Sequence, residues 1–164
     1  MKKFILILLL FSSRILFAQE NDSLVGVWQD NEVVAAGWSN TFLIFKDGTF
    51  KFFYNQMDMR KRETAFSGTW RVGEDVLNLE VKESNLLEGG RLVKNENGEK
   101  GDSVLIDAVS KTVLHNPPKE VEVSISKIYT DSPYAMGKYI YIDAIKFFLM
   151  SKNPEELLHE FEGK

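Results

Sequence analysis

The stretch Thr41–Tyr54, TFLIFKDGTFKFFY, decides the fold of this chain. Two runs of aromatic and aliphatic residues flank the turn signal Asp47-Gly48, and this pattern is typical of a β-hairpin. Both runs hold enough large apolar residues to contribute to a buried core. The next strand is predicted a short distance further along, at Phe66–Val72. The sheet is therefore expected to be built outward from this hairpin.

Two registers are compatible with the hairpin. With a two-residue type I′ turn at Asp47-Gly48, Phe45 lies opposite Phe50; with a three-residue turn and a glycine bulge, Ile44 takes that place. A change of one residue moves a whole strand's side chains to the other face of the sheet. The aromatic residues after the turn share the apolar face in both registers. The bulged turn is preferred because it gathers the largest apolar set on one face: Phe42, Ile44, Phe50 and Phe52.

The first 18 residues have the features of a secretory signal peptide. Two lysines precede the apolar run Phe4–Phe11, and a second apolar group ends at Ala18 before polar residues begin. The continuous run is too short for a membrane span, which needs about 20 apolar residues, and Arg14 interrupts any longer one. We therefore expect cleavage after Ala18 and export to the periplasm or the exterior, with no stable membrane anchor left. An uncleaved anchor is the alternative.

Composition limits the kind of protein that remains as residues 19–164. That length suits a single domain with its own core. The full chain carries a formal charge of −4, and loss of the basic leader makes it more negative, which argues against nucleic acid as a partner. The chain contains no cysteine, so apolar burial without disulfides is expected to hold the fold together.

The rest of the chain predicts further strands and one helix. Asp75–Lys82 alternates apolar and polar residues, as a half-buried strand does. Asn116-Pro117-Pro118 is expected to end a strand, and Tyr139–Met150 to supply one or two closing strands. A proline and two acids after Asn153 predict a short C-terminal helix. The prediction is an all-β, antiparallel up-and-down barrel of about eight to ten strands with that helix attached.

Three short motifs carry a resemblance to a known group. Gly26-Val27-Trp28, the segment FKDGTF at 45–50, and Gly68-Thr69-Trp70 together resemble the secreted bacterial lipocalin-like domains of the calycin group, over about residues 24–150. The resemblance implies a barrel closed by pairing of its first and last strands, with a cavity for an apolar small molecule. It also implies a basic residue above Trp28, for which Lys127 and Lys152 are candidates. The second Gly-x-Trp is attributed to strand curvature rather than to duplication.

The inner face of the predicted barrel supplies the candidate ligand site. An eight-stranded barrel is just wide enough either to fill with side chains or to hold one small ligand. The same aromatic residues are therefore candidates either to line a ligand cavity or to form a packed core. They are Phe42, Phe50, Phe52, Tyr54, Phe66 and Trp70.

Other candidate sites are few. The basic run Arg60-Lys61-Arg62 stands out in an acidic chain and is a candidate contact for an acidic protein partner. His115 and His159 are the only histidines and lack metal-ligand spacing, so neither a metal nor another cofactor is expected.

Three functions follow in order of preference. The first is an exported binding module for a small apolar or amphipathic ligand. The second is a protein-interaction or inhibitor barrel that acts through its loops. An enzyme comes last, because no catalytic constellation is visible.

Overall fold

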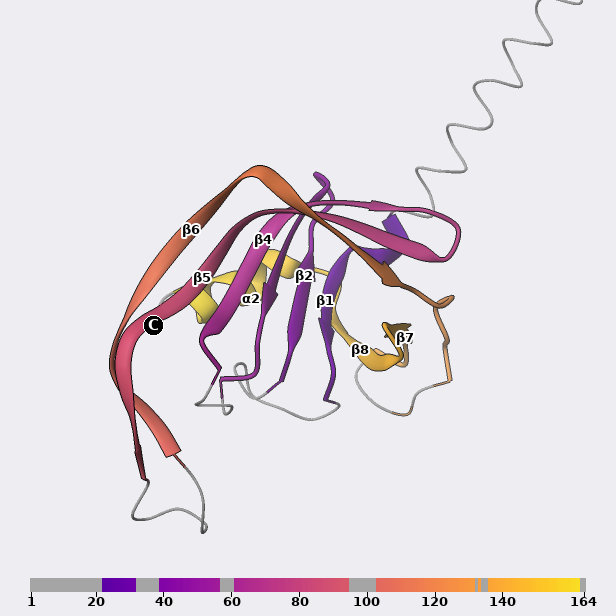
Figure 1. Ribbon diagram of the computed structural model, residues 1–164. Coiled ribbons are helices and arrows are strands. Elements are labelled where there is room, and N and C mark those ends of the chain that lie inside the picture. Colours follow the sequence, from indigo (N-terminus) through magenta and orange to yellow (C-terminus); the bar gives the residue numbers. More distant parts are fainter. Residues whose placement is uncertain are drawn as a thin grey trace, which may run out of the picture.

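The computed structural model describes residues 22–31, 39–56, 61–94, 103–131, 133 and 136–162. The predicted leader at 1–18 and Arg60 lie outside these residues, and so does the side chain of His159. The described chain is an eight-stranded antiparallel sheet followed by one helix (Figure 1). Its elements are β1 (Gly26–Gln29), β2 (Thr41–Ile44), β3 (Thr49–Phe53), β4 (Glu63–Val72), β5 (Val76–Lys94), β6 (Ser103–Ser124), β7 (Tyr139–Ile142), β8 (Ile145–Ser151) and α2 (Pro154–Glu162).

The sheet does not close into the predicted barrel. Its strand order is β6-β5-β4-β3-β2-β1-β8-β7, so β6 and β7 form its two edges. The expected pairing of first and last strands is present, because β1 pairs with β8. Beyond that pair, β7 folds back onto β8. Among the described residues, β7 meets the chain that follows β6 through two isolated bridges, Ile125 to Ile142 and Tyr129 to Tyr139, and a few further hydrogen bonds such as that from the Ser126 N–H to the Tyr141 carbonyl. A closed barrel needs edge strands that pair along their length, and the 4 residues of β7 cannot match the 22 of β6.

The central hairpin uses the bulged turn. Phe42 lies opposite Phe52 and Ile44 opposite Phe50, which confirms the preferred register. Gly48 has a φ of 84°, which an L side chain rarely adopts. The Asp47 carboxylate accepts hydrogen bonds from the Thr49 backbone N–H at 2.8 Å and from its hydroxyl at 2.6 Å. These bonds lower the pKa of Asp47 and stabilise the turn.

A line of irregularities crosses β4, β5 and β6 and bends the sheet. The β4–β5 register shifts between Ser67 and Gly68, and the β5–β6 register shifts at the same level, around Lys82. On β6, residues 115–118 face Lys82 alone. A Cβ on Gly68 would lie 1.8 Å from the Glu80 carbonyl oxygen, so only glycine lets the two backbones approach this closely.

The prolines of β6 do not end the strand, contrary to the prediction. β6 runs from Ser103 to Ser124 through a cis Asn116-Pro117 bond. Proline lacks a backbone N–H, and neither proline needs one here, because residues 115–118 have no ladder partner on β5 at the point where the register shifts. The position of the prolines at this bulge, which the sequence pattern does not reveal, explains the error.

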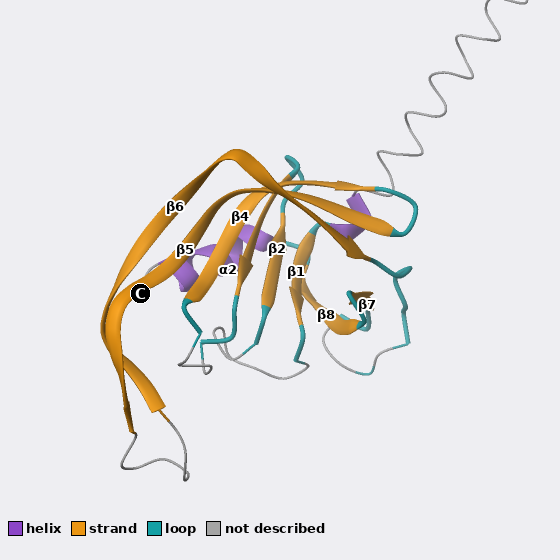
Figure 2. Ribbon diagram, in the orientation of Figure 1, coloured by secondary structure: helices purple, strands orange, loops and turns teal. Residues whose placement is uncertain are grey.

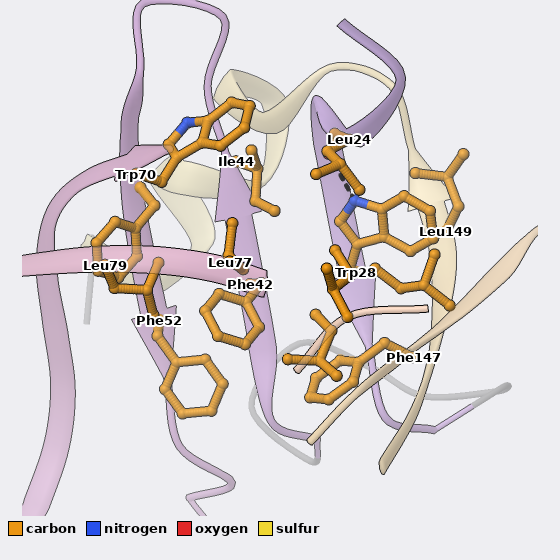
Figure 3. Packing of buried hydrophobic residues seen from close by; sticks show 14 of the residues in the cluster. Leu24, Trp28, Phe42, Ile44, Phe52, Trp70, Leu77, Leu79, Phe147 and Leu149 are labelled. Carbon is orange, nitrogen blue, oxygen red and sulfur yellow. Dashed lines mark hydrogen bonds between the residues drawn. The ribbon is translucent and has the colours of Figure 1, made fainter. Parts of the chain in front are cut away.

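Apolar side chains cover both faces of the sheet. The larger cluster fills the concave face and includes Trp28, which is fully buried and donates its indole N–H to the Leu24 carbonyl at 2.7 Å (Figure 3). The smaller cluster lies on the convex face, where α2 packs behind β1 and β2 (Figure 2). Its members are Val27, Leu43 and Phe45, with Phe53, Met150, Leu157 and Leu158 around them. The predicted C-terminal helix therefore docks on the outside of the sheet.

Candidate functional site

The six predicted aromatic residues meet on the concave face. Phe52 is central: its ring centroid lies 4.4 Å from that of Phe42, 4.8 Å from that of Phe66 and 4.9 Å from that of Tyr54. The tilted and edge-on geometries are those that aromatic rings prefer in packed interiors. The cluster forms because alternate residues of β3 point to the same face as their partners on β2 and β4. Its full membership is Phe42, Phe50, Phe52, Tyr54, Phe66 and Trp70, joined by Phe147.

A pocket of about 350 Å³ opens at the end of this aromatic row. Tyr54, the last aromatic residue after β3, is the one member of the predicted set that lines it. Leu87 of β5 and Val104 and Leu105 of β6 contribute apolar walls. The polar end is made by Lys61 and residues beside it, and the complete lining is Tyr54, Asn55, Gln56, Lys61, Glu63, Thr64, Leu87, Val104 and Leu105. The volume lies in the range of small-molecule sites.

Three groups define the polar end of the pocket. The Tyr54 hydroxyl donates to Glu63 Oε2 at 3.2 Å, and the Lys61 ammonium lies 3.8 Å from the centroid of the Tyr54 ring. Burial raises the pKa of Tyr54 to about 12, and the charge and hydrogen bond of Glu63 act in the same direction. The phenol is therefore neutral at ordinary pH and holds the Glu63 carboxylate, while Lys61 brings a positive charge to the same spot.

Two of the three residues predicted to contact a partner, Lys61 and Arg62, are described by the structure, and both make contacts within the chain. Lys61 stacks on Tyr54, as above, and Arg62 donates from Nη1 to the carbonyls of Leu87 and Gly89. The backbone N–H of Leu87 in turn donates to the Arg62 carbonyl at 2.7 Å. Arg62 thus fastens the start of β4 to β5 at Leu87 and Gly89. Contact with a protein partner through this run stays a prediction.

A second, more polar pocket of about 460 Å³ lies on the convex face, across β3 to β6. Its floor is tied together by hydrogen bonds between neighbouring strands. Ser67 donates to Glu83 Oε1 at 2.6 Å, and Thr112 donates to Asn85 Oδ1 at 2.9 Å. Because these groups satisfy one another, the pocket offers an incoming ligand few unpaired polar atoms.

His115 forms a hydrogen bond with a serine that is distant in the sequence. Its Nε2 lies 3.0 Å from the hydroxyl of Ser84 on β5. Ser84 is only 2% exposed, so an electrophilic substrate has no route to the hydroxyl. The pair therefore satisfies a buried polar group and does not form a nucleophile and base. Among the described residues, no three histidine or acidic side chains gather as a metal site would require.

Lys152, one of the two candidates for a basic residue near Trp28, lies just after β8 and binds the backbone that leads into β1. Its ammonium donates to the carbonyls of Ser23 at 2.9 Å and Val25 at 3.1 Å. Trp28 bonds the intervening Leu24 carbonyl, so the two side chains together hold the chain that enters β1. Partial burial lowers the pKa of Lys152, with a further contribution from nearby Lys138.

Three tyrosines form a cluster beside β7, and the sequence indicates only two of them. Tyr129 and Tyr139 stack with their rings 4.8 Å apart and 9° from parallel, and Tyr141 meets both edge-on. Lys146 lies 4.0 Å from the Tyr139 ring centroid. The spacing of Tyr139 and Tyr141 indicates a shared face. Tyr129 joins them through its isolated bridge to Tyr139, a pairing that the sequence pattern does not predict.

The described part of the chain contains no helix long and apolar enough to cross a bilayer. In comparisons with known proteins, no family, no curated protein and no solved structure matches this chain.

Proposed function

We propose that this protein is an exported binding module for a small amphipathic ligand, and that the pocket beside Tyr54 is its binding site. The observation that carries the proposal is the division of this pocket into an apolar side and a charged end. Leu87, Val104 and Leu105 line one part, and Lys61 and Glu63 lie with Tyr54 in the other. Ligand pockets typically combine apolar walls with a few placed polar groups.

The charged end favours a ligand with an anionic or hydrogen-bonding head. The Glu63 carboxylate already accepts from the Tyr54 hydroxyl, whereas the contact that the described residues show for the Lys61 ammonium is with the face of the ring. An anionic head can approach that ammonium while the alkyl part lies against the leucines. A relation to the lipocalin-like group in architecture is part of the same proposal. The antiparallel meander and the pairing of β1 with β8 support it.

Binding is tested by titrating octanoate, octanol and octylamine, which share a chain and differ in head group. We expect octanoate to bind more tightly than octylamine in calorimetry. Lys61→Met keeps the length of the side chain but removes its charge, and should weaken octanoate up to about fivefold, since an exposed ion pair contributes about 1 kcal/mol at most. Binding of octanol should be unchanged.

A blocking variant locates the site. Leu105→Trp should fill the pocket and abolish binding of octanoate and octanol. Leu92→Trp is the matched control, because Leu92 lies directly opposite Leu105 in the β5–β6 ladder, is 57% exposed and does not line the pocket. If both tryptophan variants bind like the wild type, or if no octyl compound binds, the proposal is wrong.

A further inference from the structure

The unpaired edge of β6 is the largest open feature of the sheet. Figure 1 shows β6 as its outermost strand, and within the described residues β5 is its one ladder partner along 103–124. Its apolar side chains include Val109, 69% exposed, and Leu114, 75% exposed. A long edge strand presents a row of free N–H and C=O groups that can pair with another strand.

Protection of this edge is confined to one half of the strand. Prolines at 117 and 118 and charges at 119, 120 and 122 occupy its C-terminal part, and such residues discourage edge-to-edge pairing. The N-terminal part, 103–115, contains no proline and only two charged residues apart from His115: Asp107 and Lys111. Pairing is thus blocked beyond 115 and permitted before it.

We propose that segment 103–115 pairs antiparallel with the same segment of a second copy of this chain, with Val109 on the two-fold axis. In an antiparallel ladder, two opposed residues point their backbone N–H and C=O groups either both toward each other or both away. These groups alternate along a strand, and the register of β6 on β5 is the same on both sides of Asp107, so a residue on the two-fold axis must lie opposite itself. This leaves one possible register for every choice of axial residue.

Charge selects Val109 among these registers. With Val109 on the axis, Asp107 of each copy lies opposite Lys111 of the other, and opposite charges on paired residues stabilise a ladder. An axis at Asp107 would place the two aspartates against each other, and an axis at Lys111 would do the same with the two lysines. The pairs these residues make within one chain, Arg91 to Asp107 at 3.4 Å and Glu88 to Lys111 at 2.8 Å, are exposed and weak.

The apolar residues agree with the same register. Val104 falls opposite Leu114 and Leu105 opposite Val113, so the most exposed leucine of β6 meets an apolar partner. Val104 and Leu105 also line the pocket beside Tyr54, so the second copy would extend its apolar wall. The pairing itself does not depend on ligand binding. Its tests measure association of chains, so the two proposals can fail separately.

Cysteine cross-linking tests the register, because the chain has no cysteine of its own. Val109→Cys should form a reducible covalent dimer under mild oxidation, since directly opposed strand residues come close enough for a disulfide. Val121→Cys is the matched control on the same strand, beyond the prolines, and should not cross-link. Ala108→Cys and Ser110→Cys should each fail alone and cross-link when mixed. Equal cross-linking at 109 and 121, or none in the mixture, would overturn the register.

Association is measured by light scattering on the wild type at increasing concentration. We expect the mass to rise from one chain to two, and Val109→Lys to raise the dissociation constant by about tenfold or more, because two lysines then face each other. Val121→Lys should behave like the wild type. Circular dichroism checks that both variants fold. These substitutions avoid Asp107, whose φ of 60° makes it hard to replace. A wild type that stays at one chain up to about 1 mM contradicts the proposal.

Discussion

Replacing Gly68 by alanine tests whether the bend across β4 and β5 depends on close backbone contact. The new Cβ would lie 1.8 Å from the Glu80 carbonyl oxygen and 3.0 Å from the Lys82 nitrogen, both of which are backbone atoms. Neither can rotate away as a side chain does, so β5 must move and its bulge at Lys82 must deform. Forced backbone shifts of this kind cost about 1–3 kcal/mol, and this contact lies at the severe end, so we expect about 3 kcal/mol.

Urea unfolding followed by circular dichroism measures that loss. For a domain of this size, about 3 kcal/mol corresponds to a drop in melting temperature of roughly 6–12 °C. Gly73→Ala is the matched control, because a Cβ there meets its nearest atom at 3.7 Å, an ordinary van der Waals contact. We expect that variant to stay within about 0.5 kcal/mol of the wild type. If Gly68→Ala is as stable as Gly73→Ala, the close approach does not shape the sheet.

Three further substitutions address the site and the core. Burial raises the pKa of Tyr54 from its ordinary value of 10.0 to about 12, so the stability that this neutral phenol contributes is present below pH 10 and falls as pH rises toward 12. Tyr54→Phe should flatten the pH dependence of unfolding in that window. Lys152→Met should speed amide hydrogen exchange in 22–26, since two of its carbonyl partners lie there, and unchanged exchange would contradict this. Phe52→Ala should destabilise by about 3–5 kcal/mol in urea unfolding, and a loss below about 1 kcal/mol would mean that the rings do not pack as described.

The hairpin and the core could be predicted from local patterns. A turn signal with glycine fixed the register of β2 on β3, and alternation of apolar residues identified the concave face. The helix start after Asn153 was equally local. These features depend on residues close together in the sequence, so the sequence alone contains what determines them.

Closure and the pocket could not be predicted in the same way. Whether a sheet closes depends on the relative lengths and bends of distant strands, such as the 19 residues of β5 and the 22 of β6. The pocket joins Tyr54 and Lys61 to Leu87 and Leu105, which come from separate strands and the connection between β3 and β4. Arg62, which the sequence marks only by its charge, also donates to backbone carbonyls of β5, a contact that depends on how β4 and β5 pair.

The position of β1 between β2 and β8 affects how the chain folds during synthesis. This four-residue strand, which carries the buried Trp28, lies between β2, its near neighbour in sequence, and β8, close to the C-terminus. Contacts between segments so far apart form slowly, because a long loop must close first. A nascent chain that has not reached Ile145 therefore presents β1 as an unpaired, apolar edge, and this edge is covered only when β8 has been made.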